Sequence, residues 1–453
     1  MATLFGNPLT FTVRRCNPEF VAPANPTPRE QKLLSDIDDQ ASLRFQIPLI
    51  FFYRHQPSME GKHPADVIRT ALAETLVLYY PLAGVLFIKA DADVTLEQFG
   101  DALQPPFPCF DELLFDVPGS QGILNCPLLL IQVTRLKCGG FIFAIRLNHT
   151  ICDAPGVKQF VSSVAAMARG EATHLILPVW ERHLLDAGDP PRVTLNHNEY
   201  DEVEAGVTTR TTSLLFDDNV VQRSFFFGPT EVSLLRRFLP VHLRHCTKFE
   251  LLTALLWRCR SLAINLQPHE HVRMIIAVNA RSKIEPPLPH GYYGNAFGLP
   301  AAITTVKNLS DNPLGYAVEL VKQTKASFSK EYMKSVAALM VIRGKRPVVL
   351  NVISSFIISD LTKLGLEDVD FGWGKAVFVG TPNAIGETSF SVQAKNKKGE
   401  VGTSIAICLP VPAMESGAAE MEKIEIKLDR PLAFVGCVQR WNLCGPMLSP
   451  KLV

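Results

Sequence analysis

The chain has 453 residues, of which 47% are hydrophobic and 20% charged, and its formal net charge is +1. These values are normal for a globular enzyme, and the length allows two domains of ordinary size. The near-neutral charge balance argues against a nucleic-acid-binding surface or a polybasic membrane patch.

Ten cysteines are scattered along the chain. They form no CxxC pair, and no histidine–cysteine cluster has the spacing of a zinc site, so we expect no metal. Their distribution is typical of free thiols in a reducing compartment. The N-terminal stretch has no apolar signal core, and no apolar run is long enough to cross a bilayer. We therefore expect a cytoplasmic protein.

The first half of the chain mixes strand-like and helical patterns. Pro64 suits the first position of a helix, because proline lacks the N–H that this position leaves unpaired. Thr95 and Gln98 have the spacing of a capping box. The patterns predict strands at 9–15, 45–53 and 85–90 and a helix at 64–80.

Residues 128–137 and 141–148 are two strand-like runs joined by a turn with two glycines, which predicts a hairpin. His149 follows the second run directly, and a helix with an apolar stripe begins near Pro155. A histidine therefore lies where a strand gives way to a helix, with Asp153 four positions further on. A catalytic base is commonly held at such a junction.

The polar segment 186–219 has no sustained period, and we interpret it as a long crossover between two domains. The strands and helices do not alternate strictly, which favours mixed sheets over a doubly wound parallel sheet. In the second half the patterns predict strands at 224–227, 272–280, 348–359, 375–380, 389–394 and 401–408, and helices at 247–264, 314–341 and 413–423.

The motif HxxxD occurs twice, at His149 to Asp153 and at His197 to Asp201, and alone it is weak evidence. His197 lies in the polar crossover, which indicates a solvated loop residue. His149 is held between two packed elements, which favours a catalytic base. The alternative for that motif is a core histidine satisfied by backbone groups, with the aspartate as a helix N-cap.

Cys152, inside the first motif, is a possible thiol nucleophile. No second histidine is placed to activate it, which favours a small buried residue.

A second stretch, 370–374, interleaves two aromatic residues with two glycines just before a strand, which indicates a tight turn packed by its rings. Arg281 ends an apolar strand, and a buried arginine there needs a carboxylate. Asp153 and Asp370 are both candidates for that partner.

The stretches 149–156 and 370–374, in this order and in opposite halves of the chain, resemble the plant BAHD acyltransferase family. The pair is far more specific than either stretch, and the resemblance covers nearly the whole chain. Three further stretches resemble the branch that transfers benzoyl, anthraniloyl or similar groups to small alcohols. These stretches are 34–40, 178–182 and 291–295.

The resemblance implies a mixed α/β fold of two chloramphenicol-acetyltransferase-like domains, each a mixed sheet with helices, with a substrate channel between them. It implies acyl-CoA as co-substrate without a permanently bound cofactor, a small alcohol as acceptor, no nucleic-acid or membrane partner, and a monomer. The expected parts are an N-terminal domain at 1–185, the crossover at 186–219, a C-terminal domain at 220–423 and a divergent tail at 424–453.

The resemblance also implies residue roles. His149 is the general base that takes the proton of the acceptor hydroxyl, and no acyl-enzyme is needed. Asp153 points away from the substrate and pairs with Arg281, which braces the loop that carries the histidine. The second stretch stabilises the C-terminal domain through Asp370, Gly372 and Gly374, and Trp373 approaches the channel.

The sequence departs from the family pattern in three places. After Gly84 roughly one strand with its turns is missing, which predicts an unpaired edge in the first sheet and leaves an inactive or impaired relative as an alternative. Lys248 stands where the branch usually has a small hydroxyl residue, and we interpret it as a solvated charge rather than a contact to CoA phosphate. Ile424 to Val453 does not resemble the family's ending, and we interpret it as a poorly packed tail.

The same histidine geometry would serve an amine or water as the acceptor. An N-acyltransferase or a thioesterase-like hydrolase therefore stays open as an alternative to ester formation.

Overall fold

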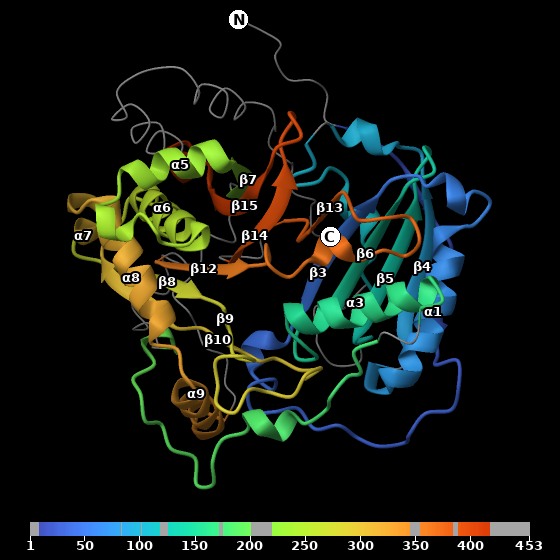
Figure 1. Ribbon diagram of the computed structural model, residues 1–453, viewed down its shortest axis with the longest axis horizontal. Helices are drawn as coiled ribbons and strands as arrows, with labels where there is room; N and C mark the ends of the chain where they lie inside the picture. The colour runs from blue at the N-terminus through green and yellow to red at the C-terminus, as the bar shows by residue number, and fades with distance from the viewer. Residues whose placement is uncertain are drawn as a thin grey trace, which may run out of the picture.

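The computed structural model describes residues 9–82, 84–100, 102–117, 126–171, 175–200, 220–344, 354–383 and 388–416. Within these ranges the chain forms two mixed β-sheets with helices packed against each of them (Figure 1). The predicted mixed α/β class with two sheets is confirmed. None of the helices in these ranges is both long and apolar enough to cross a membrane.

The first sheet has the strand order β1-β4-β5-β6-β3-β13, and β2 also pairs with β4. Its central strands are nearly continuous apolar runs because both of their faces are covered. Helices α1 (Pro64–Leu78) and α3 (Ala154–Ala168) pack together over one face (Figure 1). The strands are β1 (Val13–Arg15), β2 (Glu19–Val21), β3 (Gln46–Tyr53), β4 (Val85–Ala92), β5 (Leu129–Arg135), β6 (Phe141–Asn148) and β13 (Phe378–Gly380).

Strand β4 begins directly after Gly84, where we expected a strand of the family pattern to be missing. It pairs with β5 on one side. On the other side β1 pairs with its C-terminal end and β2 with its N-terminal end, at Val13↔Ala92 and Val21↔Val85. The prediction of an unpaired edge at β4 is therefore wrong, because the two short strands β1 and β2 pair with the side of β4 that faces away from β5. Short strands at a sheet edge also limit pairing with other chains.

The second sheet has the strand order β11-β8-β12-β14-β15-β7, and a two-stranded ribbon of β9 and β10 extends from it toward the first half (Figure 1). The strands are β7 (Val220–Phe227), β8 (His271–Ile276), β9 (Val278–Asn279), β10 (Phe297–Gly298), β11 (Ala301–Thr305), β12 (Ser355–Asp360), β14 (Thr388–Lys395) and β15 (Val401–Pro410). The helices of this half are α5 (Pro229–Arg237), α6 (Lys248–Ala263), α7 (Val306–Asp311), α8 (Leu314–Ala326) and α9 (Lys330–Ile342).

Short helical segments lie in the connections. The segment η4 follows the predicted capping box, in which the Thr95 N–H donates to Gln98 Oε1 at 2.8 Å. The short helical segments of the connections are α2 (Phe110–Leu113), η1 (Ala41–Leu43), η2 (Pro57–Met59), η3 (Tyr80–Leu82), η4 (Leu96–Phe99), η6 (Arg182–Leu185), η7 (Asn198–Tyr200), η8 (Val241–Leu243) and η9 (Leu366–Asp368).

The single helix expected at 314–341 is two helices, because α8 ends at Ala326 and α9 begins at Lys330. The Ser329 hydroxyl accepts a hydrogen bond from the Tyr332 N–H at 3.1 Å, so this serine caps the second helix. A serine hydroxyl can replace a helix carbonyl as the acceptor of a backbone N–H. Ser329 does so here, and a new helix begins although the apolar pattern of the sequence continues.

Strand β13 comes from the second half of the chain but pairs with β3 of the first sheet, at Phe378↔Phe52. Sheet membership therefore does not follow the expected boundary between 1–185 and 220–423, and the domain limits stay a prediction. The tail 424–453 and residues 201–219 of the crossover lie outside the described residues.

Candidate active site

His149 is the first residue after strand β6, and its backbone N–H donates to the Phe45 carbonyl at 2.8 Å. Helix α3 begins five residues later with Asp153 as its N-cap. The half-buried imidazole lies between the rings of Phe45 and Phe297, whose centroids are 5.3 and 5.8 Å from its own. Gly156 permits the tight turn, because a Cβ there would lie 2.5 Å from the Cβ of Cys152.

The imidazole makes one side-chain hydrogen bond, between Nδ1 of His149 and Oδ1 of Asn295 at 3.1 Å. No described residue hydrogen-bonds its Nε2 atom. Burial lowers the pKa of His149, and it outweighs the opposing effects of a backbone group, Asp153 and Asn295. A neutral imidazole with a free Nε2 can accept a proton, which is what a general base requires.

Asp153 and Arg281 form a two-pronged ion pair, in which Nη1 donates to Oδ2 at 2.7 Å and Nη2 to Oδ1 at 2.9 Å. Of the two carboxylates considered for Arg281, the structure joins it to Asp153. The same carboxylate accepts from the N–H groups of Gly156 at 3.2 Å and Ala296 at 3.0 Å. It therefore caps α3 and also ties the histidine loop to the segment before β10.

The stretch 370–374 is a tight turn closed by Asp370, whose Oδ1 accepts from the N–H groups of Gly372 at 2.7 Å and Gly374 at 2.8 Å. Both glycines have positive φ angles, +105° and +83°, which residues with a Cβ rarely adopt.

The rings of Phe371 and Trp373 belong to the core of the first half, where they lie 5.1 Å from the ring of Phe143 and 5.2 Å from that of Phe141. The rings of this stretch pack on the first sheet, in a cluster that also contains Phe390 and Val392 of β14, and the expected stabilisation of the C-terminal domain stays a prediction. Trp373 is only 5% exposed, which leaves it little surface to offer a substrate channel.

His197, the histidine of the second HxxxD match, is buried rather than solvated, so that interpretation is wrong. Its Nδ1 lies 2.9 Å from Glu199 Oε1 and its Nε2 lies 2.7 Å from Ser335 Oγ. Glu199 also accepts from the Tyr332 hydroxyl at 2.6 Å. These polar groups satisfy one another, so the described end of the crossover, 197–200, packs on α9. Both ring nitrogens are engaged, and neither is left free to act as a base.

Cys152 is 1% exposed, and its thiol lies 3.4 Å from the Tyr293 hydroxyl. Burial raises its pKa to about 12. A thiol in this setting stays protonated and is not a nucleophile.

The residue roles inferred from the sequence missed Asn295, Asp38 and Arg182, which surround the histidine loop. All three are buried, and Asn295 lies 146 positions from His149. A separation of that size leaves no local pattern. The only signal was the family resemblance of 34–40, 178–182 and 291–295, which assigned no role to these three.

Comparisons with known proteins show what the whole chain is similar to. Residues 11–424 match a family described as the Transferase family. The benzyl alcohol O-benzoyltransferase of Nicotiana tabacum is 58% identical over 447 residues, which cover 94% of this chain and 96% of that protein. The alcohol acyl transferase 1 (allele GSa) of Malus domestica is 51% identical and covers 91% of this chain and 94% of its own.

The crystal structure of vinorine synthase has a TM-score of 0.68 at 21% identity, covering 89% of this chain and 96% of that one. This likeness concerns the fold. The curated relatives extend across both halves of the chain, and the alternative of an inactive relative is not supported.

Proposed function

Because the chain belongs to the BAHD acyltransferase family, we propose that it transfers a benzoyl, anthraniloyl or similar group from acyl-CoA to a small alcohol, which forms an ester. The observation that carries this proposal is the half-buried, neutral imidazole of His149 with an unbonded Nε2. The names of the tobacco and apple relatives support the acyl group and the alcohol as substrate classes.

The proposed chemistry needs one base and no covalent enzyme intermediate. Nε2 of His149 takes the proton of the alcohol while the alcohol oxygen attacks the thioester carbonyl. The tetrahedral intermediate collapses, the carbon–sulfur bond breaks, and the leaving CoA thiolate takes the proton back from the imidazolium. Proton transfer to a positioned histidine contributes about 10²–10⁴-fold to such a rate.

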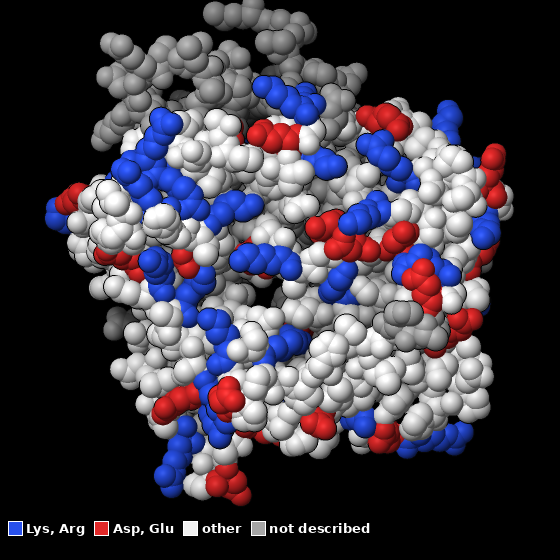
Figure 2. All heavy atoms as spheres, in the orientation of Figure 1, with Lys and Arg blue, Asp and Glu red and all other residues white. Residues whose placement is uncertain are grey.

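Both halves of the chain surround the proposed base. Phe45 comes from the first half, and Phe297 and Asn295 come from the second. Figure 2 shows a face that is hollowed near its centre, where the two halves meet, with Lys and Arg side chains beside the hollow. A substrate channel between the halves would let acyl-CoA and the alcohol reach His149 from different sides.

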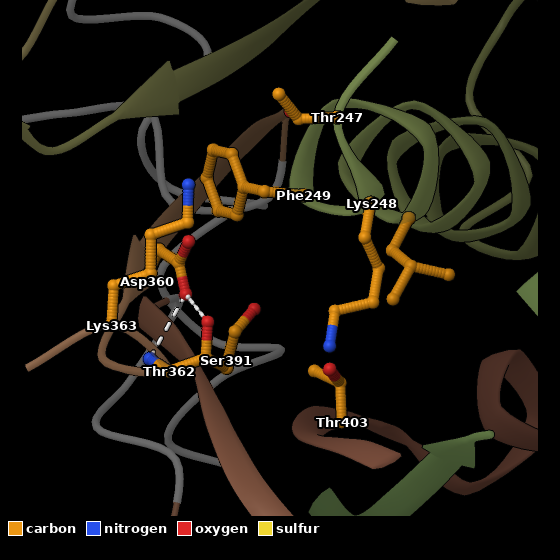
Figure 3. A pocket seen from close by; sticks show the side chains of 9 residues that line it. Thr247, Lys248, Phe249, Asp360, Thr362, Lys363, Ser391 and Thr403 are labelled. Carbon is orange, nitrogen blue, oxygen red and sulfur yellow. Dashed lines mark hydrogen bonds between the residues drawn. The ribbon is translucent and has the colours of Figure 1, made fainter. Parts of the chain in front are cut away.

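A pocket at the N-terminus of α6 supports acyl-CoA as the donor (Figure 3). The pocket lies at the seam between the two cores, since Leu252 belongs to the second core and the neighbouring Leu361 to the first. A helix N-terminus favours bound anions through its free N–H groups and its dipole. The lining residues are Thr247, Lys248, Phe249, Leu252, Asp360, Thr362, Lys363, Ser391 and Thr403.

Two lysines and one buried hydroxyl suit this pocket to a phosphate group of CoA. The exposed side chain of Lys248 runs along the wall toward Thr403 (Figure 3). The Thr403 hydroxyl is buried and has no hydrogen-bond partner among the described residues. Asp360 opposes an anion, but its Oδ1 is held by the N–H and hydroxyl of Thr362 at 3.0 and 2.6 Å. We therefore propose that Lys248 contacts a phosphate of CoA, which is the alternative to the expected solvated charge.

We also propose that the protein acts as a monomer in the cytoplasm. The site draws His149 and Asn295 from one chain, so a second subunit is not required to assemble it. The cysteines in the described ranges are free thiols, in keeping with a reducing compartment.

Product analysis tests the proposed reaction. Purified protein is incubated with benzoyl-CoA and benzyl alcohol, or with anthraniloyl-CoA and methanol, and the products are separated and identified. Ester formation is the expected result. Release of CoA with free acid and no ester would instead indicate a hydrolase, and an amide formed from an added amine in place of an ester would indicate an N-acyltransferase.

A further inference from the structure

Asp38 is a fully buried carboxylate in a segment to which the proposed chemistry assigns no role. Its Oδ2 accepts from the Ser35 N–H at 3.1 Å, the Ser35 hydroxyl at 2.8 Å and Arg182 Nη1 at 3.0 Å. Its Oδ1 accepts from the Asn295 N–H at 2.7 Å and from Asn295 Nδ2 at 2.9 Å. A buried charge is costly unless its bonding is satisfied, and here both oxygens are fully engaged.

The amide of Asn295 has only one orientation that satisfies its neighbours. Its Nδ2 donates to Asp38 Oδ1 at 2.9 Å and to the His149 carbonyl at 2.8 Å. An ionised carboxylate and a carbonyl can only accept hydrogen bonds, so the nitrogen must face them. The amide oxygen therefore faces Nδ1 of His149, at 3.1 Å.

This orientation decides the tautomer of the imidazole. An amide oxygen is an acceptor, so the His149 nitrogen that faces it, Nδ1, must carry the hydrogen. In a neutral ring the lone pair then lies on Nε2, the atom that no described residue hydrogen-bonds.

Arg182 links the same carboxylate to the loop that follows the histidine. Its Nη1 bonds Asp38, and its Nη2 donates to the Ile151 carbonyl at 2.7 Å. Nη1 also lies 3.4 Å from the Thr150 carbonyl. Asp38 is thus connected to the imidazole through Asn295 and to the loop backbone through Arg182.

We propose that Asp38 and Asn295 are positioning residues, which hold His149 in the tautomer whose Nε2 lone pair faces the acceptor hydroxyl. This inference rests on the proposed function of His149 as the base. Asp153 has a different task, since its carboxylate bonds Arg281 and backbone N–H groups, and no hydrogen bond joins it to the imidazole.

Kinetics of Asn295 variants test the proposal. Asn295→Ala is expected to lower kcat by about tenfold or more, because removing the group that orients a catalytic histidine costs up to about 10⁴-fold in a serine protease. KM for both substrates should stay within about twofold, since the change affects the base rather than binding. Asn295→Asp puts a carboxylate beside Nδ1, which raises the pKa of His149 and should move the acidic limb of kcat/KM to higher pH.

A second readout needs no substrate. The ¹⁵N chemical shifts of His149, recorded with ¹⁵N-histidine at a pH where the ring is neutral, distinguish a protonated nitrogen from a lone-pair nitrogen. The wild-type protein should show Nδ1 protonated, and Asn295→Ala should show a mixture of tautomers. Asp38→Asn should change the spectrum in the same direction, and if that variant fails to fold, the Asn295 variants still decide the question.

Asp36→Asn is the matched control. Asp36 is another carboxylate of the same segment, and its Oδ2 accepts from the Ala187 N–H at 2.9 Å. It should keep the wild-type pH profile and tautomer. The proposal is overturned if Asn295→Ala keeps the wild-type kcat and a single tautomer, or if Asp36→Asn reproduces the changes.

The test also separates this inference from the proposed function. Full activity in His149→Ala would show that His149 is not the base. Loss of activity in His149→Ala, together with wild-type kinetics and spectra in the Asn295 variants, would support His149 as the base and refute only the positioning role of Asn295.

Discussion

The guanidinium of Arg281 holds both carboxylate oxygens of Asp153, at 2.7 and 2.9 Å, across 128 positions of sequence. The pair joins the start of α3, beside the proposed base, to the segment that follows β9. Its two side chains are 20% and 6% exposed, so the aspartate is the more deeply buried partner. In the proposed mechanism this contact gives the motif aspartate a bracing role rather than a contact with the substrate.

Arg281→Met is expected to lower the midpoint of thermal unfolding clearly and to reduce activity. Removing one partner of a buried ion pair costs about 3–5 kcal/mol, and the partial exposure of this arginine puts the expected loss at the lower end. A double variant with Asp153→Asn should lose less than the sum of the single losses. Additive losses would mean that the two side chains do not stabilise each other.

Asp370→Ala is expected to destabilise the protein while KM for both substrates stays unchanged. The change leaves the half-buried N–H groups of Gly372 and Gly374 without their acceptor, and each should cost less than the roughly 1–3 kcal/mol of a fully buried group. Thermal unfolding measures the effect.

The control for this variant is Asp368→Ala, which breaks an exposed ion pair with Lys375. It should cost at most about 1 kcal/mol. Equal losses in the two variants would contradict a special structural role for Asp370.

Lys248→Thr is expected to raise KM for acyl-CoA about two- to fivefold, because an exposed charge contact contributes about 0.5–1 kcal/mol. KM for the alcohol should not change, and the dependence of KM for acyl-CoA on salt should weaken. Lys397→Ala, at an exposed hairpin turn, removes the same charge elsewhere and serves as the control. An unchanged KM for acyl-CoA in the threonine variant would remove this lysine from the donor site.

The acidic limb of kcat/KM is expected below pH 6.5, the ordinary pKa of histidine. Burial lowers the pKa of His149, so the imidazole stays neutral and able to accept a proton down to a lower pH. Activity should therefore persist at pH 6.5 and fall only as the pH drops through the lowered value.

Phe45→Ser should admit water beside the imidazole of His149, which reduces the effect of burial on its pKa. The acidic limb of kcat/KM should therefore move upward, toward pH 6.5. A wild-type limb above pH 6.5 would contradict the assigned environment of the base.

The sequence predicted what depends on neighbouring residues. The hairpin of β5 and β6, the capping box at Thr95, and the position of His149 between β6 and α3 follow from local apolar periods and turn residues. The pairing of Asp153 with Arg281 came from the family resemblance, because local periodicity says nothing about two residues so far apart in sequence.

The rest depends on contacts between distant segments. Asp38 meets Asn295 across 257 positions, and β13 crosses to the first sheet although it follows a strand of the second. His197 was expected to be solvated because its neighbours in sequence are polar. It is buried because Glu199 and Ser335 satisfy both of its ring nitrogens. Such pairings are set by three-dimensional complementarity, which a one-dimensional period cannot express.

In the proposed mechanism Nε2 of His149 accepts the proton of the alcohol. The most direct measurement compares the initial rate of ester formation in His149→Ala with that of the wild type, both shown to be folded by thermal unfolding. His269→Ala, which changes an exposed histidine, is the control. We expect a loss of about 10²–10⁴-fold in His149→Ala and a wild-type rate in the control. A wild-type rate of ester synthesis in His149→Ala would contradict the proposed mechanism.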